Sequence, residues 1–201
     1  VDPFAPARGS FGPLVARRSP TTWDRYALFF EDVLELAPRT KLVLGGRFER
    51  IELDRRNFNV NGSFNAATSF RRDLGGSNWR AGLVHELPGG LTTYVSFNTG
   101  QDPVGANIFL VNANQDFDLA DARQLEAGVK YENRAQRLDL TAAIYDIRRE
   151  NLLTQVNAAG DLSNVGDQRS RGFEFSGNWQ PLPRWTLSGS LTWTDARFGR
   201  F

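Results

Sequence analysis

Histidine and cysteine, the side chains that most often carry nucleophilic or zinc chemistry, are nearly absent from this sequence. It contains one histidine, His85, and no cysteine. A side-chain nucleophile needs a neighbouring base, and a catalytic zinc needs about three protein ligands. Neither set can be assembled from one imidazole without a thiol. The residue types therefore indicate a protein that is not an enzyme and holds no metal of its own.

Two other groups of residues could bind ions. The cluster Asp116, Asp118 and Asp121 offers oxygen ligands for Ca²⁺, with Asn112 and Asn114 nearby, but its spacing matches no EF-hand loop and a solvated loop is the simpler interpretation. Three basic pairs could bind anionic groups through paired hydrogen bonds, although ordinary surface charge is the simpler interpretation. These pairs are Arg17–Arg18, Arg71–Arg72 and Arg148–Arg149.

The overall composition excludes one broad class of partner. The chain has 24 Lys and Arg against 23 Asp and Glu, and a nucleic-acid-binding protein usually shows a clustered basic excess. No apolar run approaches the ~20 residues that a membrane helix needs. Strands of a membrane barrel alternate apolar and polar residues, so their average hydropathy resembles that of a soluble protein.

Apolar and polar residues alternate with a period of two along most of the chain, which is the period of a β-strand. Strands are therefore the elements that must position any site. In the segment 40–55, Leu42, Leu44 and Phe48 share one face, while Arg47 and Glu49 lie on the other. The same alternation predicts eight strands in all. They are 23–37, 40–55, 78–87, 91–101, 123–133, 137–152, 169–180 and 184–198.

The predicted connections alternate between short and long. Four short turns lie near residues 38, 89, 135 and 182, and three long loops cover 56–77, 102–122 and 153–168. Residues 1–22 are rich in Pro, Gly, Arg and Ser and are expected to form a surface loop. Short turns on one rim and long loops on the other are typical of outer-membrane β-barrels.

Alternation alone also fits a soluble sandwich or a lipocalin-like barrel, in which the apolar face points inward. Strand length and aromatic placement favour a lipid-facing apolar side, because long strands and two aromatic belts match a bilayer with two interfaces. His85 is expected to lie in the belt at the short turns. Asp32 falls on the apolar face, where a β-bulge would re-aim it. The aromatic residues are Tyr131, Trp179 and Trp185 near the turns, and Phe48, Trp79, Phe97, Phe173 and Trp193 near the loops.

Four hairpins in series resemble those of TonB-dependent siderophore receptors, and most closely the ferrichrome-type receptors. Residues 26–50 end in the letters LGGRFER, and residues 78–101 begin NWRAGLVHEL. Residues 123–153 contain QLEAGVKY and LTAAIY, and residues 169–198 contain RSRGFEF and GSLTWTDA. The resemblance covers almost the whole chain in the family's order.

The resemblance implies an all-β fold, in which this chain is an antiparallel transmembrane β-barrel segment of about eight meandering strands. The complete barrel would have about 22 strands and a plug domain in its lumen. The hairpins 23–55, 78–101, 123–152 and 169–198 belong to that one barrel domain, and no part of the sequence resembles the plug or a TonB box. The chain also lacks methionine, even at position 1, so we expect a segment of a longer protein.

The function implied by the resemblance is TonB-dependent uptake of ferric siderophores across the bacterial outer membrane. The ferric siderophore would be the transported ligand, and the segment itself would bind no cofactor. The implied partners are TonB, the plug domain, the remaining barrel strands, outer-membrane lipid and lipopolysaccharide. The basic pairs would then be candidates for lipopolysaccharide phosphates.

Six aromatic residues are candidates for contact with a ligand. Exposed aromatic rings are unexpected in long loops, which draws attention to Phe64, Phe70, Phe109 and Phe117. Tyr94 and Tyr145 are predicted to face the lumen, where each could line a ligand path or pack on a plug.

Two other functions remain open from the sequence. A complete eight-stranded small barrel with a structural or adhesion role can fill its lumen with side chains, and Phe201 is a terminal aromatic of the kind such barrels carry. Arg197 and Gly199 interrupt the apolar alternation expected there. The other possibility is a soluble β-sandwich binding module, which would fold without detergent.

Overall fold

The computed structural model describes residues 18–102, 117–155 and 162–199, and it confirms the predicted all-β fold. Eight strands follow one another along the chain. They are β1 (Thr21–Ala37), β2 (Thr40–Arg55), β3 (Phe70–Leu87), β4 (Leu91–Asp102), β5 (Ala120–Asn133), β6 (Leu138–Gln155), β7 (Leu162–Leu182) and β8 (Trp185–Phe198). Among the described residues, no helix is long and apolar enough to cross a membrane.

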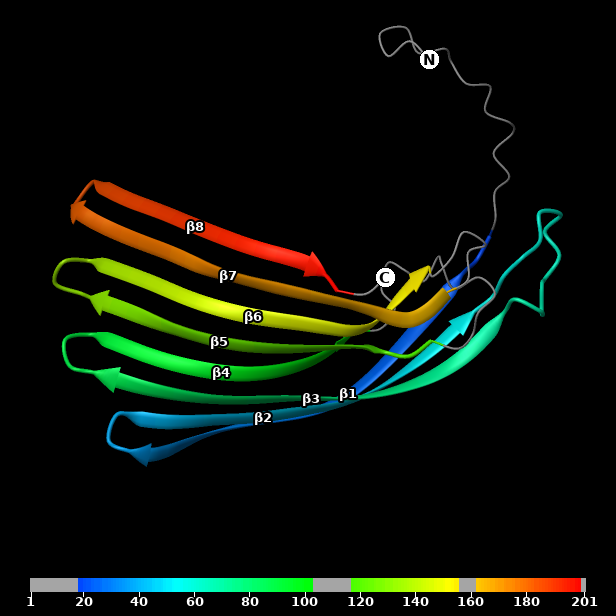
Figure 1. The fold of residues 1–201 in the computed structure, drawn as a ribbon, viewed down its shortest axis with the longest axis horizontal. Coiled ribbons are helices and arrows are strands. Elements are labelled where there is room, and N and C mark those ends of the chain that lie inside the picture. Colours follow the sequence, from blue (N-terminus) through cyan, green and yellow to red (C-terminus); the bar gives the residue numbers. More distant parts are fainter. Residues whose placement is uncertain (1–17, 103–116, 156–161, 200–201) are drawn as a thin grey trace, which may run out of the picture.

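The strands form one antiparallel meander in the order β1 to β8, and each strand pairs with its neighbours in sequence. The sheet is curved, with the short turns gathered at one end and the long connections at the other (Figure 1). The described strands form a single layer, so they do not make the two packed sheets of a sandwich. β1 and β8 are the two edges of this open sheet. The arrangement is a piece of a barrel wall.

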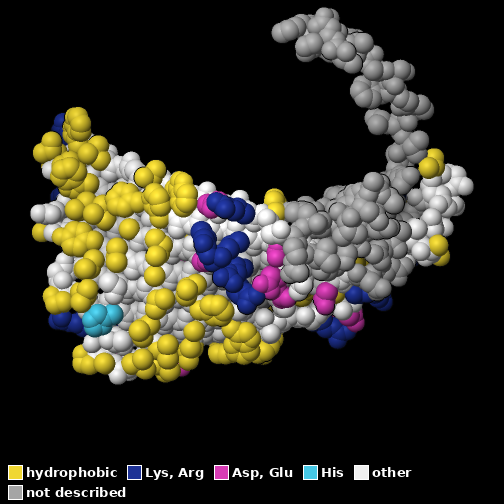
Figure 2. Space-filling view, in the orientation of Figure 1, with side chains coloured by type: hydrophobic (Ala, Val, Ile, Leu, Met, Phe, Trp, Pro, Cys, Tyr) yellow, Lys and Arg dark blue, Asp and Glu magenta, His cyan; other side chains and the backbone are white. Residues whose placement is uncertain are grey.

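Cross-strand register separates the sheet into an apolar and a polar face. One row of opposed residues runs Val129, Ala142, Phe175 and Leu191 across β5 to β8. Large apolar side chains on this face are exposed, including Leu125, Ile144 and Leu191. Figure 2 shows a broad hydrophobic area towards the short turns. Exposed apolar area of this extent marks a lipid-facing surface, which we call the outer face.

Aromatic side chains bound this apolar area at both ends. Towards the long connections, Phe173 stacks on Trp193 with ring centroids 6.1 Å apart, and Phe48 meets Trp79 edge to face at 5.2 Å. Trp179 and Trp185 lie towards the short turns. His85 is at that end as well, with its Nδ1 2.9 Å from the hydroxyl of Thr40. The two belts match the two interfaces of a bilayer.

Several strands extend further towards the long connections than the sequence predicted. β3 starts at Phe70 rather than 78, β5 at Ala120 rather than 123, and β7 at Leu162 rather than 169. The segment 71–77 falls within the predicted long loop 56–77, whose Asn, Asp, Gly and Ser residues are typical of exposed loops. It pairs in register with β2 instead, and two cross-strand ion pairs reinforce the pairing, Arg50 with Asp73 at 2.8 Å and Arg71 with Asp54 at 3.1 Å.

The structure has no β-bulge at Asp32. Asp32 stays in register opposite Leu44 on the outer face, and the irregularity in this pair of strands lies between Glu35 and Ala37. The Asp32 carboxylate accepts a hydrogen bond of 2.9 Å from the amide of Val33. The carboxylate therefore has a hydrogen-bond partner in the neighbouring backbone.

The assignment of faces predicts opposite effects for two adjacent alanines. Ala142 is on the outer face between Val129 and Phe175, whereas Ala143 is on the polar face between Gly128 and Glu174. Ala142→Arg in the protein that contains this chain should destabilise the barrel by about 2–4 kcal/mol, because a guanidinium would enter the middle of the bilayer. Ala143→Arg is the matched control, and its cost should be below about 1 kcal/mol. Urea unfolding in lipid vesicles measures both, and equal losses would contradict the assignment.

Candidate ligand-facing surface

The polar face carries ion pairs between strands, both adjacent ones and strands two apart. Lys41 of β2 contacts Glu86 of β3 at 2.8 Å, and Arg80 of β3 contacts Glu31 of β1 at 2.8 Å. Within β2, Arg47 lies 3.2 Å from the largely buried carboxylate of Glu49. The predicted polar residues therefore share one face, as the alternation required. Their charges compensate one another in a surface that suits a wet or plugged lumen.

Tyr94 is held across β5 in the middle of this face. Its hydroxyl donates a 2.7 Å hydrogen bond to Glu126, and the Lys130 ammonium lies 5.6 Å from the centre of its ring. The amide of Gln124 donates to the other oxygen of Glu126 at 2.7 Å. A Cβ on Gly128 would lie only 2.6 Å from the tyrosine oxygen. The glycine therefore makes room for the ring to lie flat on the neighbouring strand.

Tyr145 repeats this arrangement two strands further along the sheet. Its hydroxyl lies 2.6 Å from that of Thr194 on β8. A Cβ on Gly172 would come within 2.7 Å of the tyrosine ring. Both tyrosines are thus positioned by packing over a glycine and by one side-chain hydrogen bond. A fixed ring with a phenolic oxygen is suited to bind polar oxygen-rich ligands.

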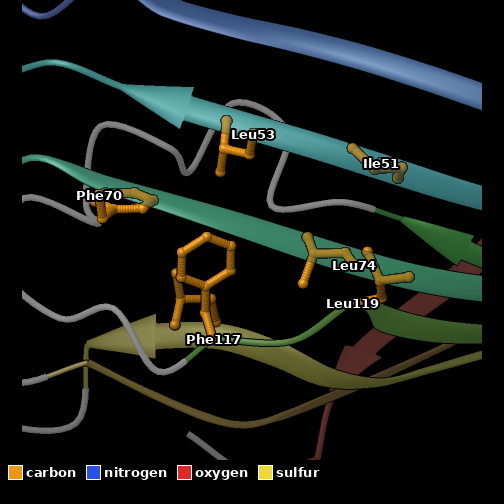
Figure 3. Packing of buried hydrophobic residues seen from close by; sticks show 7 residues of the cluster. Ile51, Leu53, Phe70, Leu74, Phe117 and Leu119 are labelled. Carbon is orange, nitrogen blue, oxygen red and sulfur yellow. The ribbon is translucent and has the colours of Figure 1, made fainter.

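Beyond the aromatic belt that lies towards the long connections, the polar face becomes apolar. The residues Ile51, Leu53, Phe70, Leu74, Phe117, Leu119 and Leu153 form a buried cluster, which we call the loop-end cluster (Figure 3). Phe117 and Leu119 come from the segment before β5 and lie on the inner side of β2 and β3. The rings of Phe70 and Phe117 meet at 5.9 Å, and Arg72 donates a 2.7 Å hydrogen bond to the carbonyl of Phe117. The end of the second long loop is therefore anchored to the wall.

The six predicted ligand-contact residues lie in three places. Tyr94 and Tyr145 are half-buried in the middle of the polar face. Phe70 and Phe117 are 8% and 2% exposed, and their rings pack within the loop-end cluster. Phe64 is 51% exposed in the first long connection, where it meets Phe58 at 5.9 Å. Phe109 is outside the described residues.

The sequence interpretation missed Glu126 and Gln124 as partners of Tyr94, and it missed the loop-end cluster. A signal for the cluster is present in β2. Apolar residues occupy even positions up to Phe48 and then move to odd positions at Ile51 and Leu53. The apolar side of the strand therefore changes face where the strand leaves the membrane.

The predicted basic pairs are divided between the two faces, because adjacent strand residues point in opposite directions. Arg71 pairs with Asp54 on the outer face, whereas Arg72 binds Phe117 on the inner side. Arg149 binds Asp102 at 2.8 Å on the polar face, and Arg148 is on the outer face. Arg18 lies over the Phe58 ring, and Arg17 is outside the described residues.

Two aspartates of the acidic cluster, Asp118 and Asp121, are within the described residues. Asp118 accepts a hydrogen bond from the amide of Leu119, and Asp121 accepts hydrogen bonds from Gln101 and Asn151. Asn112, Asn114 and Asp116 are outside the described residues. Within the residues that the structure describes, no three His, Asp or Glu side chains are grouped to hold a metal ion.

A curved antiparallel sheet with a lipid-facing outer side, two aromatic belts and a polar inner side defines the wall of an outer-membrane β-barrel. The family model described as TonB dependent receptor-like, beta-barrel, matches residues 1–200. The chain therefore belongs to the TonB-dependent receptors, which are bacterial outer-membrane transporters and not enzymes.

The relatives are receptors for several siderophores. The chain is 28% identical to a probable TonB-dependent siderophore receptor, PiuA, of Acinetobacter baumannii, over 87% of this chain and 24% of that protein. It is 26% identical to the ferrioxamine B receptor of Salmonella typhimurium, over 80% of this chain and 22% of that protein. It thus spans about a quarter of the curated relatives that it matches.

The fold matches a solved structure of the same kind. The closed form of the ferric-catecholate import receptor Fiu from Escherichia coli K12 superposes with a TM-score of 0.78 at 23% identity. The match covers 90% of this chain and 29% of that one. The eight strands are therefore a contiguous part of the barrel architecture seen in that receptor.

Phe117 and Phe64 provide a test of packing against ligand contact. Phe117→Ala should open a cavity in the loop-end cluster, at a local cost of roughly 3–5 kcal/mol, and expose the second long loop to protease. Phe64→Ala is the matched control, because its ring is exposed, and it should leave the proteolysis rate unchanged. Limited proteolysis of the receptor in detergent measures the effect. Equal cleavage of the Phe117→Ala variant and the unaltered protein would contradict the anchoring role.

The close approach of Tyr94 to β5 predicts a coupled pair of substitutions. Gly128→Ala alone should cost about 1–3 kcal/mol, because the added methyl meets the tyrosine ring. Combining it with Tyr94→Ala removes the clash, so the double variant should be more stable than the sum of the single losses implies. Urea unfolding of the four proteins gives the coupling energy. Strict additivity would show that the ring does not lie over the glycine.

Proposed function

We propose that this chain is one part of the barrel of a receptor that imports ferric siderophores with energy from TonB. The observation that carries the proposal is the family match over residues 1–200, together with relatives that are named as siderophore receptors. The ferric siderophore is the cargo of the complete receptor. TonB and the outer membrane are its expected partners.

The open edges of the sheet support a larger barrel. Backbone groups of β1 and β8 along these edges need partners, because lipid supplies no hydrogen bonds to an exposed sheet edge. We therefore propose that further strands, about 22 in all, close the barrel. The paired charges of the polar face, such as Arg80 with Glu31 and Lys41 with Glu86, then face an N-terminal plug domain in the lumen.

The ligand-contacting residues belong to the same proposal. Phe64 is exposed at the loop end, and Tyr94 and Tyr145 present fixed phenolic oxygens to the lumen. Phe109 remains a candidate from the second long loop. Phe70 and Phe117 act indirectly in this scheme, because they hold that loop against the wall through the loop-end cluster.

The class of siderophore is the finer question. The hairpin resemblance favours a ferrichrome-type hydroxamate, which agrees in chemistry with a ferrioxamine ligand. A relative of similar fold is named for ferric catecholates. Both chemistries present iron inside a shell of oxygen atoms, so the outer groups of the siderophore must decide between them.

Uptake of radiolabelled iron tests the function. The complete receptor would be expressed in an outer membrane without other siderophore receptors and supplied with ferrichrome, ferrioxamine B and a ferric catecholate in turn. At least one ferric siderophore should support uptake, and removal of TonB should abolish it while surface binding remains. Failure of the purified receptor to bind any ferric siderophore would contradict the proposal.

A pair of variants tests the ligand-facing residues. Phe64→Ala should weaken siderophore binding by about 1 kcal/mol or more, as truncation of an aromatic contact does, without changing proteolysis. Val60 lies in the same connection and is also exposed, so Val60→Ala is a suitable control. Equal affinities of the two variants and the unaltered receptor would remove Phe64 from the site.

A further inference from the structure

The hydrogen-bonded ladder between β3 and β4 ends before the two strands do. Its last pair towards the long connections is Arg80 with Asn98. Beyond that pair, β3 continues to Phe70 and stays paired with β2, and β4 continues to Asp102 and stays paired with β5. The wall is therefore divided by a seam into two parts, which we call the leaves β1–β3 and β4–β8.

Side chains of β4 replace the bonds that its main chain would make across the seam. If the ladder continued in register, Trp79 would be opposite Thr99 and Ser77 opposite Gln101. Alternate opposed pairs of an antiparallel ladder exchange two N–H···O=C bonds. Here the Trp79 amide donates a 2.8 Å hydrogen bond to the Thr99 hydroxyl, and the Ser77 amide donates one of 2.7 Å to the side-chain oxygen of Gln101. The two amides of β3 thus have partners without a main-chain ladder.

The side chain of Gln101 fits into the seam because a glycine leaves room for it. A Cβ on Gly76 would lie only 2.6 Å from the Gln101 side-chain oxygen. The nitrogen of the same amide donates a 2.9 Å hydrogen bond to Asp121 on β5, and Asp121 accepts another of 3.0 Å from Asn151 on β6. Gln101 therefore connects β3 to the other leaf. These matched groups show that the seam is a formed feature and not a frayed strand end.

The loop-end cluster spans the seam as well. Phe70 and Leu74 belong to the leaf β1–β3, whereas Phe117 and Leu119 come from the segment before β5 (Figure 3). Apolar contact has no preferred direction, so a cluster of this kind tolerates a small shift of one leaf against the other. The seam begins at Trp79 in the aromatic belt, and beyond the belt water can bind free main-chain groups, which lipid cannot.

A second arrangement of the seam costs little free energy. If the leaves approached each other, the main chains of Thr99 and Gln101 would bind Trp79 and Ser77, and the two side chains would be released to water. Hydrogen bonds contribute little net stability because water competes for the same groups. The exchange keeps the register of the strands, so no side chain changes face. Two arrangements of similar free energy make the seam a bistable element.

We propose that the seam between β3 and β4 is a two-state joint that sets the width of the extracellular mouth. In the split state, side chains bridge the leaves, and in the zipped state the main-chain ladder extends across them. The leaf β1–β3 carries the first long connection, and the leaf β4–β8 carries the second and third. Zipping therefore draws the first connection towards the second. The joint is independent of the ligand that the receptor transports.

A pair of introduced cysteines detects the zipped state. Asn78→Cys with Gly100→Cys places thiols at the next in-register position beyond the ladder, and Gly82→Cys with Ser96→Cys is the matched control within it. Opposed residues of a ladder have Cα atoms about 4.5–5.5 Å apart, which suits a disulfide. The buried side-chain oxygen of Asn78 has no hydrogen-bond partner, and the chain has no cysteine of its own. The complete receptor would be oxidised in outer membranes, and disulfide formation followed by mass spectrometry of its peptides.

The control pair should oxidise rapidly. The seam pair should react at least about tenfold more slowly, because it reacts only in a minor zipped state, and it should still go to completion because the disulfide traps that state. Equal rates for the two pairs would show that the strands are not split. No disulfide at all in the seam pair would show that they do not zip. Either result overturns the proposal.

Removing the side-chain bridges should shift the joint. Thr99→Val with Gln101→Met, added to the seam pair, should raise its oxidation rate roughly two- to tenfold, the effect of losing a typical hydrogen bond from the split state. Thr92→Val removes a hydroxyl within the ladder and should leave the rate unchanged. An unchanged rate in the bridge variant, or an equal rise in the Thr92→Val control, would overturn the proposal. Should the bridge variant fail to fold, the two cysteine pairs in the otherwise unaltered receptor still decide.

Discussion

Cross-strand hydrogen bonding in lipid is the constraint on which the rest of this structure depends. A bilayer offers no partner to a free amide or carbonyl, so every strand in it must pair on both sides. The meander meets this requirement with seven antiparallel pairings between sequence neighbours. Once the register is set, each residue is committed to one face. The polar and apolar surfaces are consequences of that pairing.

At the aromatic belt towards the long connections, the two faces of the sheet exchange their polar and apolar character. On the membrane side of Phe48 and Trp79, apolar residues face outward and charged residues face inward. Beyond the belt, Arg50 and Asp73 face outward and Ile51 with Leu74 face inward. Water replaces lipid as the outer solvent at this depth, so the apolar side of the strand moves to the inside. The loop-end cluster is the small hydrophobic core that results.

Much of the fold follows from the sequence because alternation with a period of two is a strong local signal. It located β2 at its observed ends and placed Tyr94 and Tyr145 on the polar face. The start of β3 was missed because Asn, Asp, Gly and Ser in 56–77 are typical of an exposed loop, whereas in the structure the segment from Phe70 pairs with β2 and forms ion pairs with it. The burial of Phe117 was not predictable either, since it depends on a contact with Phe70, 47 positions away in sequence. The local alternation determines which face of the sheet a residue occupies. Packing between distant segments determines which loop residues are buried and which stay exposed.

Adjacent residues of single strands serve the two surfaces of this wall. On β6, Tyr145 points to the lumen and binds Thr194, while Asp146 points outward and pairs with Arg171. On β5, Arg123 is outward and Gln124 supports Glu126 on the inside. Because a shift of one residue would exchange every side chain between lipid and lumen, the strand cannot move to adjust one surface without destroying the other. The backbone is thus fixed by the membrane, and ligand choice must be made by side chains and by the loops beyond the belt.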